Sequence, residues 1–194
     1  MKKILFSVAT SAVLFSGAAS ADNFQRAVDY LKDDAYVKAT IGFADVGLDD
    51  SALAVTGTYG KNLPHIHPGV SAEFDLSFSL SDAESTYSHS MGRGKLSASY
   101  VALGAYGVYE HGLDDLLANL SIYGRAGLVY TSFDAETSSS YGGYSASNSF
   151  SDSSFDLGLG VGGRYQYNEP VSFVVDYTTF DEVDLFSVGA RYEF

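Results

Sequence analysis

His89 is the residue of this sequence that most resembles part of a catalytic site. Ser88 and Ser90 flank it, and Glu84 lies five residues earlier. Serine, histidine and a carboxylate are the groups that hydrolases combine for nucleophilic catalysis. The surrounding segment is so rich in serine that such neighbours are expected by chance, and a solvated loop histidine is the simpler interpretation. We therefore predict no catalytic residue, with a hydrolytic enzyme as the alternative.

Two further histidines have a spacing that would allow metal binding. His65 and His67 are two residues apart and lie between Pro64 and Pro68. In an extended segment their rings would face the same way and could hold zinc, but only His111 is a candidate for a third ligand. A rigid polar turn is the simpler interpretation. The sequence also has no cysteine, so we predict no metal site and no cofactor.

Eight charged residues form a third group, for which the available chemistry is ion pairing. Each lies in a segment that alternates apolar with polar or small residues, and each falls on the polar side of the alternation. They are Lys38, Glu73, Asp75, Arg125, Arg164, Asp176, Arg191 and Glu193. Four are positive and four are negative, so one enclosed space that held all eight would be electrically neutral.

The elements that carry these charges are predicted to be β-strands, because apolar residues recur at every second position. Within residues 69–80, for example, Phe74 and Leu76 share one side and Glu73 and Asp75 the other. Eight segments follow this pattern, and each has about the ten residues that a tilted transmembrane strand needs. They are 36–44, 52–61, 69–80, 95–109, 120–130, 155–167, 171–180 and 184–194. The sequence therefore predicts an all-β protein with eight antiparallel strands.

The segment 95–109 has no single phase. Leu96 and Tyr100 fit one side of a strand, whereas Val101 and Leu103 fit the opposite side. A β-bulge between the two pairs would let both face outward. We therefore expect a bulge in this strand.

Residues 1–21 have the composition of a secretory signal peptide. Lys2 and Lys3 precede an apolar run, and small residues lead up to an expected cleavage after Ala21. Removal of this segment takes away two positive charges and no acid, so the formal net charge changes from −13 to −15. So acidic a chain lacks the basic surface that nucleic-acid binding requires.

Residues 22–34 do not alternate with period two. Phe24, Val28 and Leu31 recur at helical spacing, which predicts a short amphipathic leader helix on the periplasmic side. A frayed segment is the alternative. The strand-rich region is predicted to extend over residues 35–194.

The last predicted strand carries aromatic residues at its end. Tyr192 and Phe194 are in phase with the apolar side of that strand. Together with the signal peptide and the strands rich in glycine and aromatic residues, this resembles the small OmpA/OmpX-type barrels of the bacterial outer membrane. The resemblance implies a closed, up-and-down transmembrane barrel of eight strands. It also implies that the barrel assembly machinery reads Tyr192 and Phe194, and we expect the barrel to be monomeric.

The interior of a barrel of this size is just wide enough for its own side chains. Charges that point inward are then buried and must be paired, because an isolated buried ion costs several kcal/mol or more. We therefore predict that the eight charges listed above form a salt-bridge network that fills the lumen. A narrow ion path that opens when the network rearranges is the alternative.

The longest predicted connection, residues 131–154, is rich in serine, tyrosine and glycine. Such low-complexity composition predicts a mobile loop, and the barrel topology would place it outside the cell, near lipopolysaccharide. Tyr141, Tyr144 and Phe150 are its predicted contact residues, because aromatic groups among serines suit adaptable binding to a host or matrix ligand. The predicted role is structural or adhesion-like, with a lipid-modifying enzyme and a soluble periplasmic carrier as alternatives.

Overall fold

The computed structural model describes residues 33–89, 92–113, 117–141 and 144–194. The chain separates into two units, Met1–Asp33 and Asp34–Phe194, and the second contains all the described strands. The predicted signal peptide and all but the last two residues of the predicted leader lie outside the described residues. Within the described ranges, no helix is long and apolar enough to cross a membrane.

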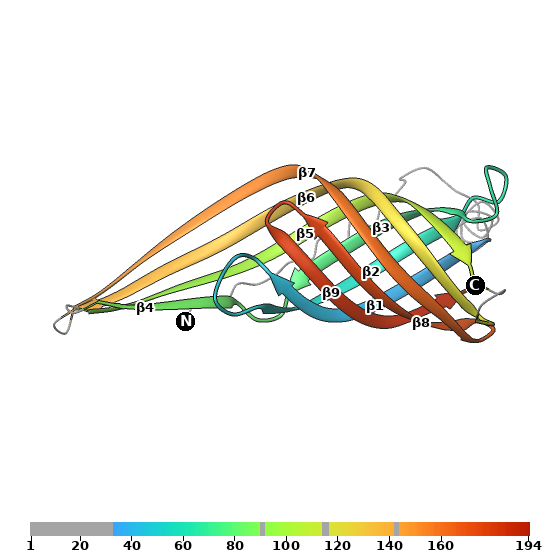
Figure 1. The fold of residues 1–194 in the computed structure, drawn as a ribbon. Coiled ribbons are helices and arrows are strands. Elements are labelled where there is room, and N and C mark those ends of the chain that lie inside the picture. Colours follow the sequence, from blue (N-terminus) through green and yellow to red (C-terminus); the bar gives the residue numbers. More distant parts are fainter. Residues whose placement is uncertain (1–32, 90–91, 114–116, 142–143) are drawn as a thin grey trace, which may run out of the picture. The chain divides into compact units, whose positions relative to one another are not determined.

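Antiparallel strands make up most of the described part of the second unit (Figure 1). In chain order they are β1 (Ala35–Asp45), β2 (Ala52–Asn62), β3 (Val70–Ser79), β4 (Ala83–His89), β5 (Gly92–Gly112), β6 (Leu120–Tyr141), β7 (Tyr144–Asn168), β8 (Val171–Phe180) and β9 (Val183–Glu193). Neighbours in the sheet follow the order β3-β2-β1-β9-β8-β7-β6-β5-β4, and β3 also pairs with β5. The β3–β5 pairing closes a barrel of eight strands, and β4 lies beside β5 as an addition to it. The predicted all-β, up-and-down barrel is thus confirmed.

The strands direct apolar side chains outward and polar side chains inward, which is the reverse of a soluble protein. Phe74 on β3 is 62% exposed, and Val175 on β8 is 45% exposed. Arg125 and Asp176, in contrast, are 7% and 2% exposed. The outer surface of the barrel therefore has the character of a surface that contacts acyl chains.

Outward-facing aromatic side chains gather at two levels of the barrel. One level holds Tyr109, Tyr165, Phe173 and Tyr192, and the other holds Phe43, Tyr130, Phe155 and Phe186. At the second level the rings of Tyr130 and Phe155 have centroids 4.9 Å apart. Two aromatic belts that flank an apolar band are the arrangement that a transmembrane barrel presents to the two membrane interfaces.

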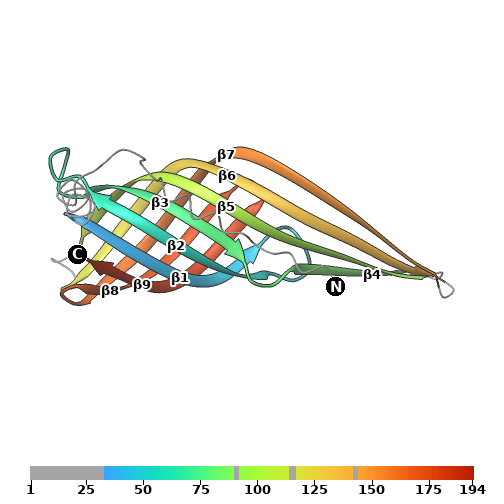
Figure 2. The ribbon, with the colours of Figure 1, turned by 180° about the vertical axis from the view of Figure 1, so that it is seen from behind.

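The two ends of the barrel differ. At the first, here called the turn end, β1 begins, β9 ends, and the strands are joined through residues 63–69, 113–119 and 169–170. At the second, here called the hairpin end, β4, β5, β6 and β7 continue past the other strands (Figures 1 and 2). This four-stranded continuation is called the extension below.

The extension corrects the prediction of a mobile loop over residues 131–154. β6 and β7 stay paired without a break from Leu120↔Tyr165 to Tyr141↔Tyr144, and β4 pairs with β5 in a segment for which no strand was predicted. Serine occupies every second position of β7 between Ser145 and Ser153. The sequence therefore still has a period of two, but serine alternates with other residues here, whereas apolar residues alternate with polar ones in the barrel.

The bulge predicted in residues 95–109 is wrong. β5 pairs with β6 in one register from Arg93↔Ser140 to Gly112↔Ser121. Tyr100 therefore points inward and is 2% exposed, with its ring centroid 6.3 Å from that of Phe133 and 6.1 Å from that of Phe180. Both faces of β5 carry apolar residues because its outer face meets lipid, whereas its inner face packs into an apolar cluster at the hairpin end.

Two glycines of β2 show how tightly the lumen is filled. Gly60 faces inward, and a Cβ atom added to it would lie 2.1 Å from Cζ of Tyr36, a side chain that is fully buried. Gly57 faces outward, and a Cβ atom added there has no neighbour within 4 Å. The Tyr36 ring therefore occupies the space that a side chain at position 60 would need.

We predict that Gly60→Ala lowers the free energy of unfolding by about 1–3 kcal/mol, the usual cost of overpacking a filled interior. Gly57→Ala is the matched control and should leave stability unchanged or raise it by up to about 1 kcal/mol, because glycine is unfavourable in strands. Urea unfolding in detergent micelles measures both. Equal stability of the two variants would contradict a filled lumen at this level.

Candidate functional site

Five buried charged side chains meet in the middle of the lumen and are called the central cluster: Lys38, Glu73, Asp75, Arg125 and Asp176. Lys38 Nζ lies 3.3 Å from Glu73 Oε1 and 3.6 Å from Asp176 Oδ1. Arg125 Nη1 lies 3.2 Å from Glu73 Oε2 and 2.6 Å from Asp75 Oδ2. These side chains are only 3–6% exposed and come from β1, β3, β6 and β8, so their ion pairs tie opposite walls of the barrel together.

Four charged side chains form a second group near the turn end, called the mouth cluster: Glu110, Arg164, Arg191 and Glu193. Arg164 Nη2 lies 2.5 Å from Glu110 Oε1, and its Nη1 lies 3.3 Å from Glu193 Oε1. Arg191 binds the same two carboxylates at 3.3 Å and 2.9 Å. These side chains are 9–35% exposed, so this cluster is wetter than the central one.

Glu110 was not among the predicted site residues, because the sequence analysis ended its strand at Tyr109. In the structure β5 continues to Gly112. Glu110 is in phase with Tyr106 and Val108, which both face the lumen, and that phase is the signal that would have identified it. The structure thus brings the eight predicted charges into two clusters rather than one network, and with Glu110 the count becomes four cations and five carboxylates.

Tyr36 lies between the two clusters and contacts both. Its hydroxyl donates a hydrogen bond of 2.9 Å to Glu73 Oε1 in the central cluster. The guanidinium of Arg191, in the mouth cluster, lies 3.5 Å from the centroid of the Tyr36 ring. An aromatic ring with a hydroxyl at one end can stabilise a cation over its face and a carboxylate at its tip.

Two more tyrosines complete the central cluster. The Tyr123 hydroxyl donates a hydrogen bond to Asp176, and the Arg125 guanidinium lies 4.6 Å from the Tyr106 ring centroid. Arg125 also donates from Nε to Thr178 Oγ1 over 3.2 Å. The carboxylates therefore receive hydroxyl donors as well as cations, which offsets the excess of negative charge in this cluster.

A polar cavity of about 600 Å³ opens at the turn end. Arg164, Arg191, Glu110 and Glu193 line it together with His67 and His111. Further into the barrel, the central cluster and its tyrosines occupy the lumen. The arrangement holds charge in fixed positions.

Two of the histidines considered for metal binding, His67 and His111, line this cavity beside the mouth cluster. Within the described ranges, no group of three or more His, Cys, Asp or Glu residues has a geometry that could hold a metal ion. His67 Nδ1 accepts a hydrogen bond of 3.2 Å from the backbone N–H of Gly69, and its ring contacts Tyr109. The backbone of His89 ends β4, but its side chain lies outside the described residues.

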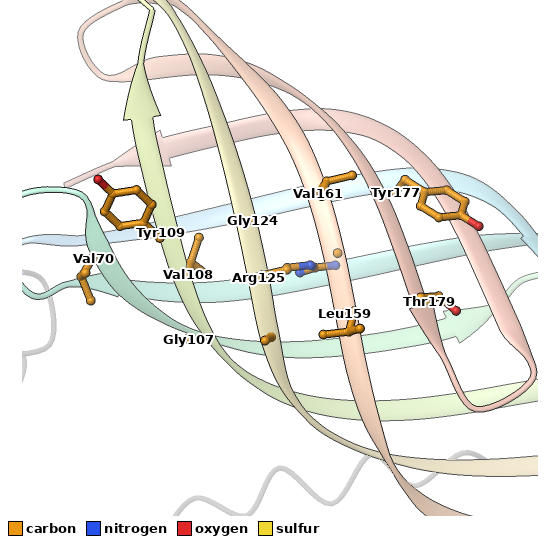
Figure 3. A pocket seen from close by; sticks show the side chains of 12 residues that line it. Val70, Gly107, Val108, Tyr109, Gly124, Arg125, Leu159, Val161, Tyr177 and Thr179 are labelled. Carbon is orange, nitrogen blue, oxygen red and sulfur yellow. The ribbon is translucent and has the colours of Figure 1, made fainter.

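A shallow apolar hollow of about 760 Å³ crosses β5, β6, β7 and β8 on the outer face of the barrel (Figure 3). Gly107 and Gly124 lie in it, and Tyr109 and Tyr177 stand at its borders. Gly124 has nothing within 4 Å of an added Cβ atom. The hollow arises where outward positions lack side chains, and its lining is that of the lipid-facing band.

The predicted contact residues lie in the extension. Phe150 on β7 is 67% exposed. The backbones of Tyr141 and Tyr144 pair with each other where β6 ends and β7 begins, but their side chains lie outside the described residues. Because strand residues alternate between faces, Ser149 and Ser151 point to the face opposite Phe150.

The chain is similar to known proteins in both sequence and structure. Residues 7–194 match the outer membrane protein beta-barrel domain family, whereas the search of curated proteins gave no match. A major outer membrane protein from Thermus thermophilus has a TM-score of 0.58 at 16% identity, over 82% of this chain and 98% of that one.

Two further solved structures show the same order of similarity. Neisserial surface protein A has a TM-score of 0.52 at 16% identity, over 82% and 96% of the two chains. The attachment invasion locus protein Ail of Yersinia pestis has a TM-score of 0.45 at 16% identity, over 82% and 96%. The family match spans almost the entire sequence, and together with the closed barrel and its apolar outer face it shows that this chain belongs to the outer membrane protein beta-barrel domain family.

Proposed function

We propose that this protein is a non-enzymatic surface-interaction protein of the bacterial outer membrane, whose extension contacts ligands outside the cell. The observation that carries the proposal is the continuation of β4, β5, β6 and β7 beyond the barrel (Figure 1). Outer-membrane barrels have short periplasmic turns and longer extracellular loops. By that rule the turn end faces the periplasm and the extension projects outward.

The lumen supports a structural role for the barrel rather than a pore. Lys38, Arg125 and their carboxylate partners are buried and paired across the barrel. Buried ions are tolerated only with such partners, and removal of one partner leaves an uncompensated charge. The central and mouth clusters therefore act as an internal brace that holds the barrel wall under the extension.

The outer face supports contact with the membrane and with the machinery that builds the barrel. Tyr192 and Phe194 are 46% and 55% exposed, and their ring centroids are 5.5 Å apart. We infer that these two rings form the surface read during assembly, with outer-membrane lipid and lipopolysaccharide as the lasting neighbours of the barrel.

Removal of one member of the brace should destabilise the barrel. Arg125→Met should lower the free energy of unfolding by about 3–5 kcal/mol, because Glu73 and Asp75 lose a buried partner. The triple variant with Glu73→Gln and Asp75→Asn as well should regain part of that loss. Lys95→Met is the control: Lys95 pairs with Glu84 at the surface, with side chains 46% and 42% exposed, so its loss should cost less than about 1 kcal/mol. A triple variant no more stable than the single one would argue against the brace.

A lumen filled by its own side chains should conduct few ions. In planar bilayers the wild-type barrel should give no reproducible large open steps, because buried side chains fill the middle of the lumen. A variant with Arg125→Ser and Tyr106→Ser removes two of the largest of these side chains and should pass more current. Large, regular steps from wild-type monomers would overturn the filled lumen and favour a channel.

A shortened extension should abolish adhesion and leave the barrel folded. Thr137 and Asn148 are Cα partners on β6 and β7, so an Asn-Gly pair in place of residues 138–147 should close a two-residue hairpin without a change of register. Cells that carry this shortened protein should lose binding to immobilised matrix proteins and host cells, while the barrel keeps its folded, heat-modifiable form on gels. Gly57→Ala cells control for expression. Full adhesion by the shortened protein would refute the proposed surface role.

A further inference from the structure

β7 has a free edge over most of the extension. It pairs with β8 only from Leu159 onward, whereas it pairs with β6 along its whole length up to Tyr165. In the described structure, residues 144–158 therefore have a strand on one side only. A row of unpaired backbone groups is a template for another extended chain.

The backbone groups that face this edge can be identified. Gln166 N donates to Asn119 O on the β6 side, so even-numbered residues of β7 direct their backbone groups to β6 and odd-numbered residues direct theirs to the edge. Ser153, an odd-numbered residue, donates its N–H to the side chain of Asp152 over 2.9 Å. An edge donor that takes its own neighbour's carboxylate shows that no strand occupies this side.

A seven-residue part of this edge reads almost the same in both directions. Residues 147–153 read Ser-Asn-Ser-Phe-Ser-Asp-Ser, which is symmetric about Phe150 except that Asn148 stands opposite Asp152. Phe150 also lies within one residue of the midpoint of the free segment 144–158. An antiparallel pair of identical strands centred on Phe150 would match residues 147–153 of one copy with the same residues of the other.

Side chains in that pairing complement each other. Phe150 would meet Phe150 of the second copy, and the exposed ring would be covered. Each Asp152 would face Asn148 of the other copy in a pair without backbone hydrogen bonds between its members, where side chains lie closest. The Asn148 amide can donate to the Asp152 carboxylate. An exactly symmetric sequence would have an aspartate at position 148, and two carboxylates would then repel each other.

The direction of β7 decides where the second copy lies. Every copy in one membrane has β7 running from the extension toward the turn end, at the tilt of about 35–45° that barrel strands adopt. Two such strands share a direction along the membrane normal and cannot be antiparallel. An antiparallel β7 pair therefore joins barrels in two opposing membranes.

We propose that the free edge of β7, centred on Phe150, pairs with the same edge of a second copy in an opposing membrane and so joins cell to cell. The inference rests on the proposed surface role, and the partner is a second copy of the same protein. Within one membrane the barrel remains the monomer that the sequence predicts. A foreign strand would gain nothing from the symmetry of residues 147–153, which is why a second copy is the favoured occupant.

The test uses two charge variants of the full barrel. Asn148→Asp puts a second carboxylate opposite Asp152, at two places in a pair of identical copies. The double variant Asn148→Lys with Asp152→Lys puts lysine opposite lysine at the same two places. A mixed pair of the two variants instead has two carboxylate–lysine contacts. Each variant should therefore fail to bind itself and should bind the other.

The measurement is docking between phosphatidylcholine vesicles that carry the barrels and are labelled with donor or acceptor lipid. Wild-type vesicles should dock with each other. Each charge variant should dock with itself roughly tenfold less or weaker still, because like charges replace an amide–carboxylate contact at two places, and the mixed variants should recover wild-type docking. Thr137→Asp adds the same charge on β6, one strand from the edge, and should dock like wild type.

Three results would overturn the inference: wild-type vesicles that do not dock, Asn148→Asp vesicles that dock like wild type, or a mixture that docks no better than either variant alone. Adhesion to matrix proteins that depends on the extension, without docking between vesicles, would refute self-pairing and leave the proposed function intact. Absence of both matrix adhesion and vesicle docking would refute the proposed function as well as self-pairing. Heat-modifiable migration of every variant on gels confirms that the barrels are folded.

Discussion

Backbone hydrogen bonding is the constraint on which this structure depends. Lipid offers no partner to a peptide N–H or C=O group, so a sheet that spans a membrane must close on itself. The pairing of β3 with β5 provides that closure. Closure in turn gives every strand one face toward lipid and one toward a narrow lumen, and the alternation of side chains along each strand follows from it.

The narrow lumen then determines which residues can lie inside. Large rings and guanidinium groups are accommodated next to positions without side chains: Gly60 lies against Tyr36, and Gly162 against Tyr123. The charges of the central cluster are far from water, so each needs a partner from another strand. The resulting cross-barrel ion pairs resist any change of barrel shape, so the side chains that pair the buried charges also brace the wall.

Much of this could be predicted from the alternation, because lipid on one side and a polar lumen on the other give each strand a strong period of two. The inward phase of Lys38, Arg125 and Asp176 followed directly. The predicted phase was wrong in residues 95–109, where the polar part of the lumen ends. Tyr100 faces inward into an apolar cluster above the polar lumen, so hydrophobicity marks both faces of its strand.

Beyond the membrane the constraint of closure is lifted, and this explains the failure at residues 131–154. Water can solvate an open edge, so β7 continues without a second neighbour. No lipid requires apolar residues there, and serine takes the outward positions, which makes the strand look like a loop in composition. A free edge still attracts other strands, and Asp152 occupies one edge donor with its own carboxylate. The edge is thus protected from indiscriminate pairing but remains open to a strand that offers Asp152 a better donor.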